Sequence, residues 1–161
     1  TAVTGVTGRQ NPGGCEYGFT KGIFGYGNDA GYLSSTNLVS DTGVMTADVT
    51  GVGTARTDLA ACSYGGDKGI FAYGKKTGNV KVSMSNLVSN TGVVGTDVTG
   101  VGTARLSLAA TQYGEDKGIF GFGNDGSDAS MTNLVTNAGV VGTDVTGVGT
   151  AREAPAACSF N

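Results

Sequence analysis

The sequence predicts an all-β protein of repeated four-stranded units, of the type that forms the blades of a β-propeller. The first observation is a stretch, Asp48–Arg56, that recurs almost unchanged at 97–105 and 144–152. Its arginines, with Arg9 before them, follow one another at intervals of 47, 49 and 47 residues, a period typical of repeat architectures. The second is that turn residues recur every ~8–12 residues between short apolar segments, which favours strands. The third is that no window shows the 3.6-residue periodicity of an amphipathic helix.

One unit shows the expected elements in chain order. A short apolar strand ends in a Gly-Gly-Asp-Lys turn, and an aromatic strand closed by glycines follows it. A variable polar loop then leads to a third strand, a Ser-Asn-Thr-Gly turn and a fourth strand rich in β-branched residues. The expected strands are 59–64, 69–74, about 82–88 and 93–98, and the variable loop is 75–81.

An aromatic pair recurs on the second expected strand of every unit. Phe71 and Tyr73 are two residues apart, so on an extended strand they share one face. We expect each pair to pack its unit against the neighbouring unit, as blades pack in a propeller. The equivalent pairs are Phe24 with Tyr26 and Phe120 with Phe122.

The order of these motifs resembles a kelch repeat. Arg56 precedes the small-residue strand with Ala60-Ala61, and the aromatic strand 70–74 and the turn 89–92 follow. The wording Asn-Leu-Val-Ser-Asn-Thr-Gly-Val-Val with Gly-Val-Gly-Thr-Ala-Arg is also similar to repeat arrays in phage and bacterial surface proteins. These resemblances imply a β-propeller fold and a virion or cell-surface context.

The repeat boundaries predict a single repeat domain over 1–161, with half-blades at both ends. The approximate blades are 9–55, 56–104 and 105–151, and expected strands at 1–8 and 152–161 complete neighbouring blades. Natural propellers have about four to eight blades, so three cannot close a ring. The ends therefore favour association with like subunits, as a ring-closing dimer or an open polymer, or continuation in a longer array.

Composition narrows the classes of function. The formal net charge is −3 and only 14% of the residues are charged, so the chain lacks the basic surface that nucleic-acid binding requires. No apolar run approaches the ~20 residues of a membrane span. The absence of histidine removes Ser-His-Asp and Cys-His catalysis and most zinc sites, and we expect no cofactor and no enzyme activity. Cys15, Cys62 and Cys158 occupy equivalent places and are expected to be inert packing thiols, or else a bridge between chains.

The recurring arginines are expected to be structural. Arginine at a strand boundary commonly ties elements together through carbonyls or a carboxylate, and Asp48, Asp97 and Asp144 recur beside them as candidate partners. With the aromatic pairs, the set expected to hold the units together contains Arg9, Arg56, Arg105, Arg152, Phe24, Tyr26, Phe71, Tyr73, Phe120 and Phe122.

The loop between the second and third strands varies between repeats and is the candidate ligand face, because such variation marks surface loops. Tyr32 offers an aromatic platform for a sugar. Asp125, Ser127 and Asp128 resemble an oxygen-rich calcium loop, although the same residue types are also typical of tight turns. The loop residues singled out are Asn28, Asp29, Tyr32, Lys75, Lys76, Asn124 and Asp125.

These observations predict a non-enzymatic structural or adhesive component of an extracellular or virion-surface assembly. The alternative is a glycan-binding propeller that uses the variable loops. A propeller enzyme would need charged residues converging on a central channel, and the sequence offers none.

Overall fold

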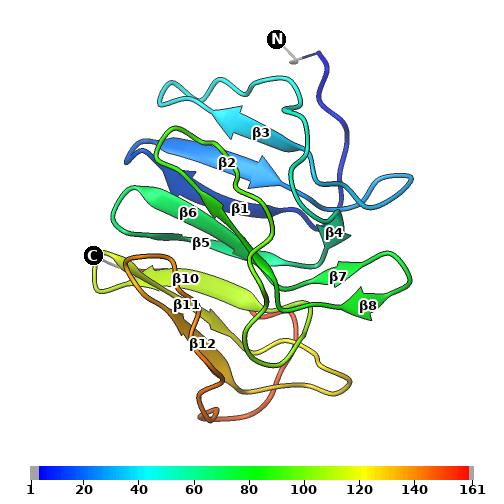
Figure 1. Ribbon diagram of the computed structural model, residues 1–161, viewed down its shortest axis with the longest axis vertical. Helices are drawn as coiled ribbons and strands as arrows, with labels where there is room; N and C mark the ends of the chain where they lie inside the picture. Colours follow the sequence, from blue (N-terminus) through cyan, green and yellow to red (C-terminus); the bar gives the residue numbers. More distant parts are fainter. Residues whose placement is uncertain (1–3, 160–161) are drawn as a thin grey trace.

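The computed structural model describes residues 4–159 and confirms an all-β fold (Figure 1). The described residues form twelve strands in four small antiparallel sheets of three strands each. No helix in this part of the chain is long and apolar enough to cross a membrane. The described chain does not close into a barrel or a ring.

Three equivalent sheets carry the repeat, and we call them the first, second and third modules. In each module a five-residue hairpin ladder pairs the first strand with the second, and a shorter third strand adds to the second. The first module contains β1 (Gly13–Tyr17), β2 (Lys21–Gly25) and β3 (Thr36–Val39). The second contains β5 (Ala60–Tyr64), β6 (Lys68–Ala72) and β9 (Ser85–Val88). The third contains β10 (Ala109–Tyr113), β11 (Lys117–Gly121) and β12 (Thr132–Val135).

A small fourth sheet occupies the variable loop of the second module. It consists of β4 (Arg56–Thr57), β7 (Lys75–Lys76) and β8 (Val80–Lys81), in the order β4-β7-β8. The loops of the other two modules make single bridges at the same places, for example between Gln10 and Asn28 and between Leu106 and Asn124. The variable loops of the three modules project from one side of the molecule, on the right in Figure 1.

The expected fourth strand is not a regular strand. After β9 the chain returns and makes two isolated bridges, Val94 with Val88 and Val98 with Ser85. The returning segment therefore spans one residue more than β9 does between the two bridges, which is the signature of a β-bulge. The other modules repeat this pattern. The bulge interrupts the ladder. It also turns the side chain of Asp97 toward Arg56, at the contact between the first and second modules.

The aromatic pair does not share one face, contrary to the sequence-based expectation. Phe71 contacts Tyr26 of the first module, with ring centroids 5.1 Å apart, whereas Tyr73 contacts Phe120 of the third module at 5.4 Å. The reason is that β6 ends at Ala72 and Tyr73 has a left-handed backbone, with φ 66°. The alternation of faces holds only while both residues are extended. Tyr26 and Phe122 have the same left-handed φ.

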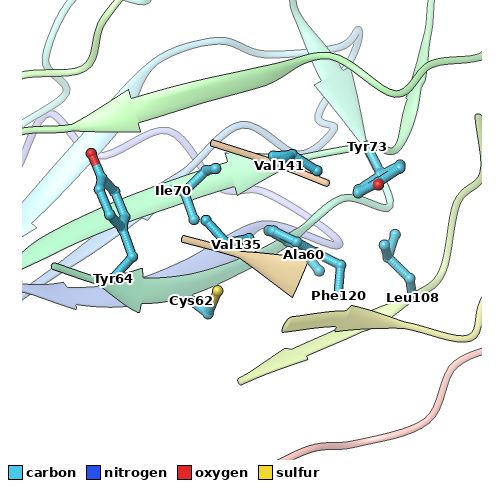
Figure 2. Packing of buried hydrophobic residues seen from close by; sticks show 10 residues of the cluster. Ala60, Cys62, Tyr64, Ile70, Tyr73, Leu108, Phe120, Val135 and Val141 are labelled. Carbon is cyan, nitrogen blue, oxygen red and sulfur yellow. The ribbon is translucent and has the colours of Figure 1, made fainter. Parts of the chain in front are cut away.

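The core lies between modules. One apolar cluster joins the first and second modules around Tyr26 and Phe71, and a second joins the second and third around Tyr73 and Phe120 (Figure 2). Phe71 and Phe120 are fully buried, but Phe24 is 44% exposed because the described chain has no module before it.

The two ends of the described chain form no strand. Residues 4–8 and 152–159 lie along the first and third modules without a ladder partner, so the strands expected at 1–8 and 152–161 are not formed in their described parts. The remaining positions of those two expected strands, 1–3 and 160–161, lie outside the described residues. A first strand at 155–159 would need the second strand of a fourth module beside it, and the described chain has none.

Candidate functional site

The most elaborate polar arrangement in the protein is the junction between two modules. At the first junction the Arg56 guanidinium lies over the Tyr26 ring, 4.4 Å from its centroid, and Phe71 contacts the same ring edge-on. At the second junction Arg105 lies over Tyr73 at the same distance and Phe120 contacts that ring. Both arginine side chains are fully buried. Each aromatic ring is thus held between an arginine and a phenylalanine of the following module, a stabilising cation–π arrangement.

An aspartate from the bulge completes each junction. Asp97 accepts hydrogen bonds from the Thr54 amide at 3.0 Å, the Thr54 hydroxyl at 2.6 Å and the Asn86 amide at 3.0 Å. Arg56 forms an ion pair with Asp97 at 3.8 Å. Burial tends to raise the pKa of Asp97, but these hydrogen bonds and the Arg56 charge outweigh it and hold the pKa below its ordinary value.

The third module repeats this arrangement. Asp144 accepts hydrogen bonds from Thr103 and Asn133 and pairs with Arg105 at 3.9 Å. Burial again opposes the hydrogen bonds, and the pKa of Asp144 is lowered. Burial raises the pKa values of Tyr26 and Tyr73 to about 12, so both phenols stay neutral beside the arginines.

The copies at the two ends are incomplete. At the first module Thr7 and Arg9 bind Asp48, with Arg9 3.3 Å from the carboxylate, but no described aromatic ring lies under Arg9. At the third module Arg152 lies over Phe122 at 5.0 Å, is exposed, and pairs with no carboxylate among the described residues. Each end therefore shows one half of a junction.

A few buried polar atoms inside the junctions have no partner, among them Arg56 Nε and the Asn86 and Asn133 side-chain oxygens. The first module identifies the expected partner, since Arg9 donates to the Asn37 oxygen at 2.8 Å. In the other two modules the arginine has turned toward the aromatic ring and leaves that oxygen free. These unpaired atoms therefore belong to the junction and do not point to a ligand.

The variable-loop residues lie on one side of the molecule and do not converge on a pocket. Lys75 pairs with Asp58 at 3.0 Å, which ties the second loop to the segment before β5, and Tyr32 is half-buried near Lys75. The hydrogen bond to Asp58 raises the pKa of Lys75. Asn28, Lys76 and Asn124 are half-buried, and Asp29 and Asp125 are exposed.

The oxygen-rich loop at 124–128 is organised as tight turns. The Asn124 side-chain oxygen accepts from the Gly126 amide at 3.0 Å, and the Asp125 carboxylate accepts from the Ser127 amide at 3.3 Å. Asp128 and Asn124 form a backbone bridge. No group of three or more His, Cys, Asp or Glu side chains suited to a metal ion is present among residues 4–159.

The three hairpin turns lie on the left in Figure 1 and are joined by backbone bonds from Gly18 to Asp67 and from Gly65 to Asp116. Beside them lies a polar hollow that the sequence did not indicate. Its volume is about 430 Å³. Equivalent positions on neighbouring first strands supply Glu16, Ser63 and Gln112, and Phe19 at a hairpin tip is 75% exposed. The remaining lining residues are Tyr17, Gly66, Asp67 and Glu115. The signal for it in the sequence is weak, because the three strand positions carry different residue types in the three repeats.

The cysteines differ in their surroundings. Cys62 is buried, and burial raises the pKa of its thiol to about 12, so it is a packing residue with little thiolate. Cys15 is half-buried, and burial together with the nearby Cys62 raises its pKa as well. Cys158 is exposed, contrary to the expectation that all three pack, because the segment that carries it has no partner strand.

No protein-family model and no curated protein matches the chain. Among solved structures, the fold is similar to that of YjhT, with a TM-score of 0.61 and 14% sequence identity. The match covers 80% of this chain and 42% of the YjhT chain, so it extends over only about two fifths of the length of YjhT. At this identity the likeness concerns the fold alone.

Proposed function

We propose that the protein is a non-enzymatic structural or adhesive component of an extracellular or virion-surface assembly. The observation that carries the proposal is the use made of its recurring charged residues. Arg56 with Asp97 and Arg105 with Asp144 hold one module against the next, and Arg9 pairs with Asp48 in the same way within the first module. The same arginine and aspartate pair recurs at each internal junction, where it stabilises the stack of modules. In this role the charged groups are used for packing and not for substrate chemistry.

Each module corresponds, in this proposal, to a kelch-like propeller blade. The three ladder-paired strands are the inner part of the blade, and the bulged return with its two bridges takes the place of the fourth strand. The fold likeness to YjhT covers 42% of that chain, which is in keeping with the described modules being part of a larger set. The partners are accordingly like subunits or further blades.

The surface location is tested on intact material from the source. An antibody against the protein is expected to label intact cells or particles as strongly as it labels lysed ones. Protease added outside is expected to remove exposed segments such as 155–159 without lysis. Labelling that appears only after lysis would contradict the proposal.

Glycan binding is a second candidate, favoured by the hollow between the hairpin turns. Its volume of about 430 Å³ lies within the range of small-ligand sites, and it combines carboxylates and an amide with the exposed ring of Phe19. Sugars are bound by such polar groups together with an aromatic face. The variable loop with Tyr32 is the alternative location on this protein.

The two locations are separated by matched variants on a glycan array. Binding that is lost in Phe19→Ala and kept in Tyr32→Ala assigns the hollow, and the reverse assigns the loop face. An array on which the unchanged protein binds no glycan would remove this candidate.

A further inference from the structure

Each internal junction contains a socket that a phenylalanine of the following module fills. Phe71 lies against two glycines of the first module and beside the Tyr26 ring. A Cβ at Gly13 would lie 3.0 Å from the Phe71 ring, and a Cβ at Gly25 would lie 3.1 Å from it. The socket therefore requires small residues at the matching ends of the first and second strands. Phe120 is buried in the same way against Ala60, Ala72 and Tyr73 of the second module.

The third module presents the same socket, and within residues 4–159 no phenylalanine of a following module fills it. The positions equivalent to Gly13, Gly25 and Tyr26 are Ala109, Gly121 and Phe122, and they line an open apolar hollow of about 140 Å³. Ala156 and Ala157 also line it. These two residues stand where the next module would begin its first strand, but the described part of the chain holds no second strand that would bring a phenylalanine to the socket.

The first module presents the complementary half. Phe24 is equivalent to Phe71 and Phe120, yet it is 44% exposed where they are fully buried. It lies with Val6, Pro12 and Met45 beside another apolar hollow of about 300 Å³. Arg9 and Asp48 are already paired there, whereas Arg152 at the other end has no carboxylate within the described chain. Among the described residues, the third module thus lacks a phenylalanine and an Arg–Asp pair at its open face, and the first module presents both.

We infer that a second copy of this chain docks head to tail, with its Phe24 in the socket of Ala109, Gly121 and Phe122. The inference rests on the proposed structural role and names the partner and the contact. The new joint repeats the two internal junctions, with Arg9 over Phe122 as Arg56 lies over Tyr26. Such an interface joins two different faces, so it propagates into a ring or a filament.

The segment 147–159 must leave for the second copy to enter, because it occupies the place of residues 4–16 of that copy, with Thr150 and Arg152 at the positions of Thr7 and Arg9. Its backbone is held at Arg152 and Ala154. The Arg152 amide donates to the Ala129 carbonyl at 3.2 Å, the Gly123 amide donates to the Arg152 carbonyl at 3.0 Å, and the Ala154 amide donates to the Ser107 carbonyl at 2.8 Å. Residues 155–159 belong to no strand. The incoming β1–β2 hairpin is fully laddered and brings its own second strand.

A backbone difference favours the exchange. Ala154 has a left-handed backbone with φ 49°, and the residue that would replace it, Asn11, already has φ 50°. Asparagine adopts this conformation readily, whereas a residue such as alanine is strained in it. The exchange therefore relieves one strained residue and adds none.

The small-residue contacts across the junctions also match. A Cβ at Gly69 would lie 2.6 Å from Cys15 Sγ, and one at Gly118 would lie 2.7 Å from Cys62 Sγ, so each glycine seats the side chain of the preceding module. Across the new joint the equivalent residues are Thr111 of one copy and Gly22 of the next. Threonine is of similar size to cysteine, and the seat is again glycine.

The test measures the mass of the purified chain against concentration by light scattering. The unchanged chain, of 16.0 kDa, is expected to form species of at least twice that mass, and removal of residues 155–161 to increase their fraction. Phe24→Asp is expected to weaken self-association at least about thirtyfold, as loss of a central interface residue does. Phe19→Asp, which alters an even more exposed phenylalanine outside the joint, is the matched control and is expected to leave the mass unchanged.

A mixing experiment separates this joint from any other contact. Ala109→Trp fills the socket, and Phe24→Asp removes the side chain that enters it, so each variant keeps one working face. Each is expected to be monomeric alone, and a mixture is expected to give one-to-one pairs that do not grow further. Circular dichroism checks that both variants keep the β spectrum.

The inference is overturned if the unchanged and shortened chains stay monomeric, or if Phe24→Asp and Phe19→Asp behave alike. It is also overturned if the two blocked variants do not pair. If the chain is monomeric but is still found on the outer surface of cells or particles, the head-to-tail contact is contradicted and the proposed structural role is retained. If the chain self-associates through Phe24 but the antibody does not label intact cells or particles, the contact is supported and the proposed surface role is contradicted.

Discussion

At the scale of single residues, the bulge aspartates connect backbone geometry to packing. The extra residue between Val94 and Val98 turns Asp97 toward Thr54, Asn86 and Arg56, two of which precede the second module's first strand. A carboxylate that accepts several hydrogen bonds and offsets a buried arginine stabilises the junction more than an exposed ion pair does. The sequence indicated the Arg–Asp recurrence but contained no sign that the hydroxyl and the amide of Thr54 both donate to Asp97.

Replacing Asp97 with asparagine is expected to lower the free energy of unfolding by about 2–3 kcal/mol, because buried Arg56 loses its counter-charge and Thr54 its acceptor. Urea unfolding monitored by circular dichroism measures this change. Asp41→Asn, an exposed aspartate in a turn, is the matched control and is expected to change stability by less than about 0.5 kcal/mol. Equal effects of the two substitutions would contradict the assigned role of Asp97.

The lowered pKa values of Asp97 and Asp144 predict a loss of stability in acid. Their folded-state pKa lies below the ordinary 3.8, since hydrogen bonds from Thr54, Asn86 and their equivalents outweigh burial. A carboxylate with a depressed pKa stabilises the fold above its unfolded pKa, and this contribution is lost as the pH falls below about 4. The melting temperature is expected to drop between about pH 6 and about pH 2.5. The Asp97→Asn/Asp144→Asn variant is expected to be less stable at neutral pH and to show a smaller drop; an unchanged drop would contradict the prediction.

At the scale of elements, the modules approach closely because glycines in the second strands seat side chains of the preceding first strands. Gly69 of β6 lies under Cys15 of β1, and Gly118 of β11 lies under Cys62 of β5. The recurrence of Lys-Gly-Ile-Phe in all three second strands is explained by this contact together with the socket that takes the phenylalanine.

Substituting Gly69 with alanine is expected to destabilise the protein by about 1–3 kcal/mol, because the new methyl would meet Cys15 Sγ and the Glu16 carbonyl. Thermal or urea unfolding measures the loss. Gly31→Ala, at a glycine with open space around it, is the control. Adding Cys15→Ala is expected to recover part of the loss, and a double-mutant cycle with no coupling would show that the two residues do not meet.

The all-β class and the first three strands of each unit were predictable from the sequence, since turn spacing and repeat period depend on local chemistry. The direction of the aromatic side chains was not. The face of Tyr73 depends on its left-handed φ, and a bulky residue between alanine and glycine gives little warning of that conformation. The bulge was missed for a related reason: β-branched residues at 93–98 favour a strand, and one extra residue becomes visible only against the pairing of β9. The polar hollow depends on three turns meeting in space, which no local pattern records.

At the scale of the whole molecule, the protein behaves as a short stack in which each module is stabilised by its neighbours. The second module has both aromatic faces covered, whereas the first leaves Phe24 partly exposed and the third leaves an open socket. In such quasi-one-dimensional arrays, stability is a sum of module and nearest-neighbour interface contributions. The middle of the stack is therefore expected to open last.

Hydrogen exchange measures this gradient with an internal control supplied by the sequence. The second strands β2, β6 and β11 read Lys-Gly-Ile-Phe followed by glycine or alanine, so their intrinsic exchange rates are nearly equal and differences report structure. At low protein concentration we expect the slowest exchange in β6, because opening it disrupts two junctions, and faster exchange in β2 and β11. Raising the concentration is expected to slow exchange in β2 and β11 together if copies join head to tail, and to leave the Phe24→Asp variant unchanged. Equal protection of all three strands at low concentration would mean that the modules unfold as one unit and that junction energies do not set the order.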